Sequence, residues 1–380
     1  MEHATTPARV VDSPDALTAC LKELGDAPEV ALDTEADSLH HYYEKVCLLQ
    51  IGTPECVYLV DPLAGFDLGR LLACLAKTRL VLHGADYDLR LLSRDYGFAP
   101  REVFDTMLAA QFLGYEGLGL GALVERHFGE NLDKAMQKAD WSKRPMAPRL
   151  LAYAAQDVRF LLPLAAQLCR ELGARGRGAW HAEACARLAR TRYEGREVDP
   201  ERDWRIKGSG QIPPRAQAFL RELWQFREAE AKASDLPSFK IIGNETLVAL
   251  ASRAAESSNG EVPSGVSLPR TFKGGRLARL QAVLASAQAL PEEAWPRPLQ
   301  SENRRRDLRM ERRLHQIKLV RDAVAVEVAT DPTLLASKAT LVAVASAGPK
   351  TLDELRALDV LMDWQVQLLG RRLLSGLAGA

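Results

Sequence analysis

Apolar and polar residues alternate along residues 28–36, a pattern that is typical of a β-strand. The period of two places Leu32 and Thr34 on one face of this strand and Asp33 and Glu35 on the other. Two carboxylates on one face repel each other, and burying them unpaired costs free energy. Such a pair therefore faces either water on a half-exposed sheet or a bound cation, and this stretch alone favours neither.

The hydrophobic pattern predicts a series of short elements along the first half of the chain. Strands are expected at residues 46–52, 56–61, 80–83 and 102–105, and helices at 14–25, 68–76, 87–96, 106–113, 118–128 and 149–162. Three strands with short connections favour an antiparallel meander, and the later alternation of strand and helix implies parallel crossovers. The predicted fold class of this half is α/β, a mixed sheet with helices on both faces.

Helical periodicity dominates the second half, which is predicted to be all-α. Helices are expected at residues 220–232, 246–254, 277–286, 314–329, 338–346, 352–357 and 363–374. The segment 246–251 resembles 340–345, and residues 220–229 align with 314–323 at the same offset. We infer two copies of a small helical bundle.

These patterns predict how the chain is divided into domains. Residues 1–175 form the α/β domain, 176–210 a connector, 211–292 the first bundle and 293–380 the second.

Composition narrows the class of protein. The 380 residues are 47% hydrophobic and 26% charged with a formal net charge of zero, so no whole-protein charge favours a polyanion, although local basic patches remain open. The six cysteines form no Cys-x-x-Cys pair, so a zinc site is not expected. The N-terminus lacks the pattern of a signal peptide, and no run approaches the roughly 20 apolar residues of a membrane helix. We expect a soluble, cytoplasmic protein.

Three carboxylate motifs occur in order on elements of the expected type. The first, Asp33 to Glu35, resembles the first motif of the DEDD superfamily of 3′-to-5′ exonucleases. Residues 83–92 are similar to the second motif, a strand end that runs into a helix carrying the second aspartate. The helical register favours Asp88 as that aspartate, with Asp86 as the alternative.

The third motif resembles the tyrosine form of the superfamily. Tyr153 and Asp157 are four residues apart on one helix face, and Ala152 stands where the histidine form has its histidine. The basic segment 131–145 before this motif resembles the ribonuclease D family in particular. That resemblance implies a ribonuclease H-like mixed sheet for the first domain.

The resemblance also implies a catalytic centre with two divalent ions, Mg²⁺ or Mn²⁺. Asp33 would bridge both ions, and Glu35 and Asp157 would complete the site of the ion that activates water. Asp88 would hold the other ion, largely through water, and Tyr153 would orient the attacking water. Carboxylates are the ligands that such hard cations prefer.

Each motif residue also has a purely structural interpretation. Taken alone, Asp157 would be a solvated helix residue, and Tyr153 would pack at the rim of the core. Asp105 is predicted to cap the helix that follows it rather than to bind metal. Asp37 is expected in a solvated loop, and Asp61 is expected to be an ordinary surface charge.

The helical bundles supply the second resemblance. The first bundle is similar to the HRDC domain shared by ribonuclease D and RecQ helicases, and the second is a more divergent copy. Scaffolding between proteins is one interpretation of the bundles, and phosphate contact with RNA is the other. The candidate RNA contacts, with Trp141 as a stacking platform, are Lys134, Trp141, Arg144, Arg227, Arg305 and Arg309.

Together these features predict a metal-dependent 3′-to-5′ exoribonuclease that acts as a monomer. It would trim the 3′ ends of tRNA precursors and other structured RNAs and release 5′-mononucleotides. One alternative is a 3′-to-5′ DNA exonuclease in repair, which the absence of a P-loop helicase motif beside the bundles disfavours. The other is a non-catalytic RNA-binding protein.

Overall fold

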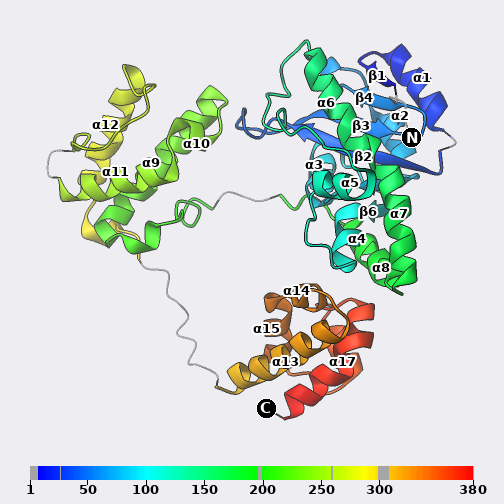
Figure 1. Ribbon diagram of the computed structural model, residues 1–380. Coiled ribbons are helices and arrows are strands. Elements are labelled where there is room, and N and C mark those ends of the chain that lie inside the picture. Colours follow the sequence, from blue (N-terminus) through cyan, green and yellow to red (C-terminus); the bar gives the residue numbers. More distant parts are fainter. Residues whose placement is uncertain (1–6, 26, 196–198, 258–259, 298–307, 380) are drawn as a thin grey trace. The chain divides into compact units, whose positions relative to one another are not determined.

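Two compact units make up the chain (Figure 1). The first comprises residues 1–36, 46–193 and 305–380, and the second comprises residues 37–45 and 194–304. The computed structural model describes residues 7–25, 27–195, 199–257, 260–297 and 308–379. The α/β half and the second bundle therefore belong to one unit, and the first bundle belongs to the other.

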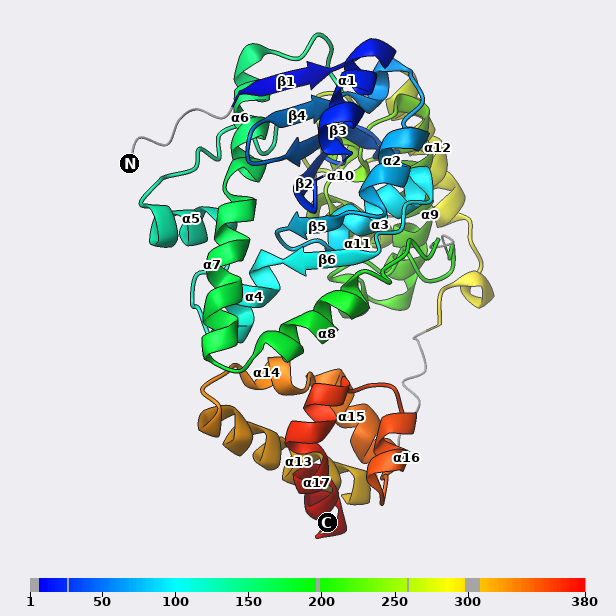
Figure 2. The ribbon, with the colours of Figure 1, turned by 90° about the vertical axis from the view of Figure 1, so that its right-hand side faces the viewer.

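A six-stranded sheet lies at the centre of the first unit, in the order β1-β4-β3-β2-β5-β6 (Figure 2). Its strands are β1 (Ala8–Val11), β2 (Glu29–Ala36), β3 (Val46–Gly52), β4 (Val57–Val60), β5 (Arg79–Leu82) and β6 (Glu102–Asp105). The predicted antiparallel meander of β2, β3 and β4 is confirmed, and β5 and β6 follow in parallel as expected. Strand β1 was not predicted, because three of its four residues are exposed and no alternation is visible.

Eight α-helices and a short 3₁₀ turn accompany this sheet among the described residues of the α/β half. They are α1 (Pro14–Leu24), η1 (Pro62–Ala64), α2 (Gly69–Leu75), α3 (Asp86–Tyr96), α4 (Thr106–Phe112), α5 (Leu120–Phe128), α6 (Pro148–Arg159), α7 (Leu161–Ala174) and α8 (Gly178–Leu188). Pro148 begins α6, where a missing backbone N–H leaves no helical bond unmade.

Two helical features differ from the prediction. The helix expected at 149–162 is interrupted at Phe160, between α6 and α7, although the apolar pattern continues across the break. Helix α8 lies inside the predicted connector. Its buried residues are His181, Ala184 and Cys185, which are small or polar and give only a weak apolar pattern.

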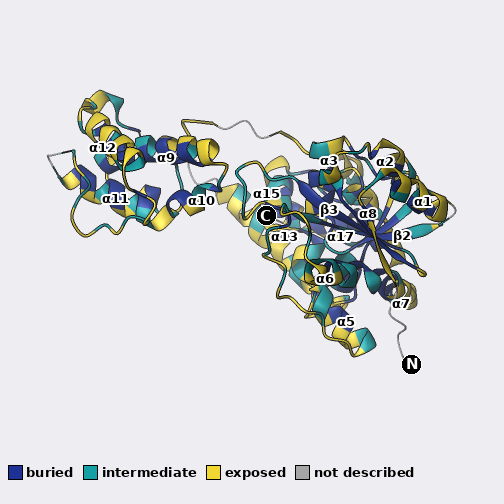
Figure 3. Cartoon of the chain, turned by 90° about the horizontal axis from the view of Figure 1, so that it is seen from above, coloured by how far each residue is buried: buried dark blue, intermediate teal, exposed yellow. Residues whose placement is uncertain are grey.

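The two faces of the sheet form separate cores. Ala31 and Leu48 lie in a cluster with residues of α6 and α7, whereas Leu32 and Leu49 lie in a cluster with residues of α1, α2 and α3. All seven residues of β3 are buried, and Figure 3 shows this strand in the dark blue of buried residues. Because both faces are covered, the carboxylates of β2 lie beneath a helix rather than on an open sheet.

The second bundle of the first unit consists of α13 to α17. These helices are α13 (Leu308–Glu327), α14 (Pro332–Leu335), α15 (Lys338–Ala347), α16 (Leu352–Ala357) and α17 (Asp363–Ala378). Trp364 stacks on Trp180 of α8 with ring centroids 4.5 Å apart, and it meets Phe112 of α4 edge to face. The bundle and the α/β half therefore share one apolar core.

The second unit contains the first bundle. Its elements are α9 (Pro214–Ser234), α10 (Ser238–Ile241), α11 (Asn244–Glu256), α12 (Gly275–Gln288) and two 3₁₀ turns, η2 (Ser209–Gln211) and η3 (Glu292–Ala294). Glu230 of α9 accepts hydrogen bonds from Arg276 and Arg279 of α12, and this clamp joins the two helices. Trp204, Phe219 and apolar residues of α11 fill the core.

Residues 37–45 belong to the second unit, and the position of Asp37 in this segment differs from the prediction. The solvated position predicted for Asp37 is wrong, because the residue is buried and accepts hydrogen bonds from the Lys45 backbone and ammonium groups at 2.8 and 2.6 Å. The turn needs an internal acceptor, and a carboxylate supplies it. Among the described residues no helix is both long and apolar enough to cross a membrane.

Candidate active site

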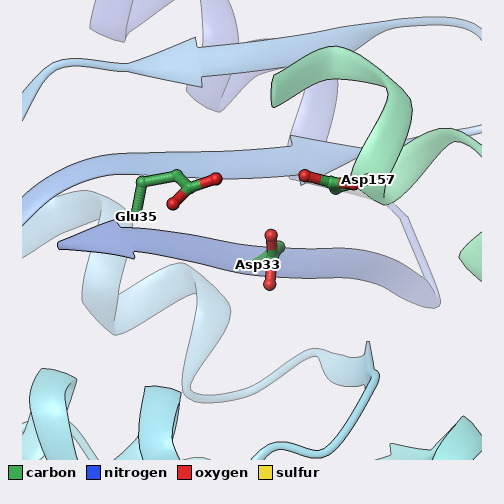
Figure 4. A group of neighbouring side chains, drawn as sticks. All are labelled: Asp33, Glu35 and Asp157. Atoms are coloured by element: carbon green, nitrogen blue, oxygen red, sulfur yellow. The ribbon is translucent and has the colours of Figure 1, made fainter. Parts of the chain in front are cut away.

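Three carboxylates from two elements meet on one face of the sheet. Strand β2 carries Asp33 and Glu35, and α6 carries Asp157 on the facing side (Figure 4). One oxygen of each carboxylate lies within 4.8 Å of the others. The residues that the strand alternation placed together are therefore joined by the aspartate of the third motif.

Asp88 lies beside this cluster on α3 and is buried. Its Oδ1 accepts a hydrogen bond of 2.5 Å from Thr34 Oγ1, and its charge acts on Asp33. Asp86, the alternative for the second motif, lies on the outer side of α3 and pairs with Arg90 at 2.8 Å. The helical register thus turns Asp88 inward and Asp86 outward. Thr34 was predicted on the opposite face of β2 from Asp33, and no pattern in the sequence indicated that it contacts Asp88.

Asp105 fixes the start of the helix that carries Asp88. Its carboxylate accepts from the backbone N–H groups of Met107 and Leu108, which confirms the predicted cap of α4. It also accepts from Gly84 and Ala85 at the entry to α3. One buried aspartate therefore holds the first turns of two helices.

Burial dominates the electrostatics of the four acids. Desolvation raises the pKa of Glu35 to about 9, with the charges of Asp157 and Asp88 adding to the effect. Desolvation likewise raises the pKa of Asp157 to about 7 and that of Asp88 to about 6, and it holds the pKa of Asp33 well above its usual range. Such acids ionise together only when a positive charge compensates them.

A divalent cation fits this donor set. The three clustered residues offer only carboxylate oxygens, the ligand type that Mg²⁺ and Mn²⁺ prefer. Because the three acids are partly desolvated and repel one another, cation binding would relieve an unfavourable arrangement. Among the described residues this is the one group of at least three potential ligands that lie close enough to share an ion.

Tyr153 stands one helical turn before Asp157 and is 8% exposed. Its hydroxyl hydrogen-bonds Asp157, which partly offsets the desolvation of that carboxylate. Burial, followed by the charges of Asp157, Glu35 and Asp33, raises the pKa of Tyr153. The phenol therefore stays protonated near neutral pH and acts as a hydrogen-bond donor.

The structure corrects one predicted RNA contact near the site, Trp141, and shows that a second, Arg144, is exposed and held by an ion pair, so its contact with RNA stays a prediction. Trp141 is not an exposed stacking platform, because it is 1% exposed and packs against Tyr153 with ring centroids 6.0 Å apart. Arg144 makes two hydrogen bonds of 2.6 Å with Asp61 and donates to the carbonyl groups of Trp141 and Cys47. Asp61 is accordingly a buried ion-pair partner, not the surface charge that was expected. These contacts fold the basic segment onto the sheet.

The other predicted RNA contacts fall into three groups. Arg227 is buried and donates to Asn244 and Glu228 inside the first bundle, so the prediction of an RNA contact there is wrong. Lys134 and Arg309 are exposed, and their role stays a prediction. Arg305 lies outside the described residues.

Comparison with protein families defines the class of the chain. A family described as 3′-5′ exonuclease matches residues 8–173, and the HRDC domain family matches residues 216–260 and 310–377. The protein thus consists of a 3′-5′ exonuclease domain followed by two HRDC domains. The second match shows that the repeated bundle also belongs to the HRDC family.

Similarity to individual exonucleases shows to which family of 3′-5′ exonucleases the chain belongs. Ribonuclease D of Escherichia coli (strain K12) is 33% identical over 296 residues, which cover 77% of this chain and 78% of that protein. The structure of Escherichia coli RNase D, described as an exoribonuclease involved in structured RNA processing, has a TM-score of 0.69 at 27% identity and covers 98% of this chain and 99% of its own. The catalytic core of RRP6 from Trypanosoma brucei has a TM-score of 0.66 at 26% identity, covering 76% and 82%. The chain belongs to the ribonuclease D family and is a 3′-5′ exoribonuclease.

Proposed function

We propose that the chain hydrolyses the terminal phosphodiester of RNA with two divalent ions held by Asp33, Glu35, Asp88 and Asp157. The observation that supports this most directly is the approach of three half-buried carboxylates to within 4.8 Å of one another. The charges of Asp88, Asp157 and Glu35 all act on Asp33 and raise its pKa. Asp33 is therefore the residue that we propose to serve both ions.

Two such ions, Mg²⁺ or Mn²⁺, would neutralise the scissile phosphate, activate a water and stabilise the leaving oxygen. The protein's own residues orient the reactants. Tyr153 carries a protonated hydroxyl beside Asp157, so it donates a hydrogen bond and does not remove a proton. We propose that it orients the attacking water in line with the phosphorus, which would release a 5′-mononucleotide.

The substrate that we propose is the 3′ end of structured RNA, including tRNA precursors. Support comes from the Escherichia coli relative, which is described as acting in structured RNA processing. The exposed cations Lys134 and Arg309 would contribute phosphate contacts. Because all four acids come from one chain, we propose a monomer, and because tRNA precursors are its substrate, we place it in the cytoplasm.

A digestion of one tRNA precursor with a 3′ trailer, labelled at its 5′ end, tests this function. The reaction is run with Mg²⁺, with Mn²⁺ and with chelator, using the wild type and Asp33→Asn. We expect a ladder that shortens from the 3′ end, requires metal and is lost in the variant. A wild-type rate in Asp33→Asn would refute the metal assignment.

Two further outcomes separate the alternatives. A DNA strand of the same sequence is digested in parallel, and faster shortening of DNA would favour a DNA exonuclease. Binding of the precursor without shortening under any metal would favour a non-catalytic RNA-binding protein.

A further inference from the structure

A buried side-chain amide lies next to the carboxylate cluster. Gln50 of β3 is 0% exposed, and it pairs directly with Asp33 of β2 in the antiparallel register. Neither Gln50 Oε1 nor Gln50 Nε2 has a hydrogen-bond partner among the residues that the structure describes. Buried amides in folded proteins are nearly always hydrogen-bonded, so this exception requires an explanation.

The register places the amide on the face of the acids. Cross-strand partners in an antiparallel pair point to the same side of the sheet, so Gln50 lies on the side of Asp33. Two residues along, Gly52 pairs with Ala31 on that side, and a Cβ at Gly52 would lie 3.2 Å from the carbonyl oxygen of Val158. Val158 follows Asp157 on α6. Gln50 therefore lies on the face of the sheet that α6, the helix that carries Asp157, covers.

Packing alone does not call for an amide at this position. Apart from Asp33 and Gly52, the neighbours of Gln50 on this face are Leu48 on its own strand and Leu59, its partner on β4, and both are fully buried. A leucine or methionine would fill such a place without leaving two polar atoms desolvated. The polar group thus points to a role that the apolar neighbours do not have.

We infer that Gln50 is a positioning residue for the metal site, and that its Nε2 donates a hydrogen bond to Asp33 when that carboxylate holds ions. Carboxylates that bind metal are themselves held by hydrogen bonds, which fix the direction of their remaining oxygen lone pairs. Gln50 is placed to do this because it is neutral, so it orients Asp33 without adding another negative charge to the cluster. The inference rests on the proposed role of Asp33 as a ligand.

The test compares Gln50→Met with Leu59→Met in the full-length protein. Both variants place a methionine beneath α6, but only the first removes the amide. Mn²⁺ affinity is measured by electron paramagnetic resonance, and thermal unfolding is measured in chelator. We expect Gln50→Met to unfold at a midpoint no lower than the wild type, yet to bind Mn²⁺ about 10- to 100-fold more weakly, whereas Leu59→Met binds it normally.

Cleavage kinetics give a second readout. We expect Gln50→Met to lower kcat and to leave KM for RNA unchanged, because the amide acts on Asp33 and not on the RNA. Gln50→Asn, which withdraws the amide by one methylene, should also weaken Mn²⁺ binding, and it serves if Gln50→Met does not fold. Wild-type Mn²⁺ affinity in the folded Gln50 variants would overturn the inference. If Asp33→Asn still loses cleavage, that outcome would leave the proposed function standing.

Discussion

Burial of like charges sets the chemistry of the site at the scale of single residues. Asp33, Glu35 and Asp157 share one small volume, and desolvation is the largest cause of the rise in pKa of each. Without a cation the fold favours their protonated forms. The residues that we propose as metal ligands therefore oppose folding when they are ionised and no metal is present.

This conflict predicts how stability depends on pH in chelator. The folded protein keeps protons on Asp157 and Glu35 that the unfolded chain releases above pH of about 4. The free energy of unfolding therefore falls as pH rises from about 4 to the pKa of Asp157, about 7, and falls further up to the pKa of Glu35, about 9. Each of the two groups contributes a loss of about 1.4 kcal/mol per pH unit while only the unfolded chain is ionised, so we expect a loss of several kcal/mol between pH 5 and 8, measured by urea unfolding. Asp157→Asn should show a shallower decline. Equal slopes for the two proteins would contradict the prediction.

The proposed role of Tyr153 predicts that its hydroxyl affects the rate of cleavage but not the affinity for metal. Tyr153→Phe removes the hydroxyl that contacts Asp157 and keeps the ring that packs on Trp141. We expect single-turnover cleavage to slow by about 10²- to 10³-fold, in the range of groups that position or protonate reactants. Mn²⁺ affinity should stay near that of the wild type.

Tyr115→Phe is the matched control, because that hydroxyl bonds Glu171 away from the acids. It should leave cleavage unchanged. A collapse of metal binding in Tyr153→Phe would show that the tyrosine supports the ligands rather than the water.

At the scale of elements, Asp105 links two helix starts to the site. It accepts from backbone N–H groups at the beginning of both α3 and α4, and α3 carries Asp88. Helix starts that are far apart in sequence thus share one cap, so the position of Asp88, a proposed metal ligand, depends on the buried carboxylate of Asp105.

Asp105→Ala should therefore change both stability and metal binding. We expect a loss of about 1–2 kcal/mol for the cap, together with weaker Mn²⁺ affinity, because the first turn of α3 is released. Asp331→Ala removes the cap of α14 in the second HRDC domain and should cost stability only. Urea unfolding and Mn²⁺ titration of both variants test this. Unchanged Mn²⁺ affinity in Asp105→Ala would show that α3 is held by packing.

At the scale of the whole molecule, the second HRDC domain is part of the first unit. Glu183 of α8 accepts hydrogen bonds from the backbone of Asp363 and Trp364 at 2.6 and 3.0 Å, so a residue of the nuclease half caps α17. The Arg177 guanidinium donates to backbone carbonyl groups on both sides, those of Phe112 and Val328. Deleting this domain would expose the apolar core around Phe112. A deletion variant would therefore report on the folding of the nuclease half as well as on RNA binding.

Glu183→Ala tests the coupling directly. The variant leaves the first N–H groups of α17 without their carboxylate, and we expect a loss of about 1–2 kcal/mol in the free energy of unfolding. Glu125→Ala, an exposed glutamate of α5, is the control and should be neutral. If the two variants unfold alike, the cap contributes nothing and apolar packing alone joins the domains.

The sequence by itself determined those features whose cause is local. Alternation along β2 placed Asp33 beside Glu35, and helical spacing placed Tyr153 beside Asp157. The short connections implied the meander, and the capping preference of aspartate identified Asp105. In each case the feature depends on residues within about five positions of one another, or on the periodicity of a single helix or strand. Such a periodicity can be recognised directly in the sequence.

Tertiary structure alone decided which distant residues meet. Arg144 and Trp141 are basic and aromatic residues that suit RNA equally well in sequence, yet Arg144 pairs with Asp61 and Trp141 is buried against Tyr153. Nothing in the sequence distinguished Gln50 as a functional residue. Only the strand register, which pairs it with Asp33, indicates a role for it. Whether a side chain is exposed, and which partner it contacts, depends on how segments that are distant in the sequence pack together. The hydrophobic periodicity of a single helix or strand carries no information about that packing.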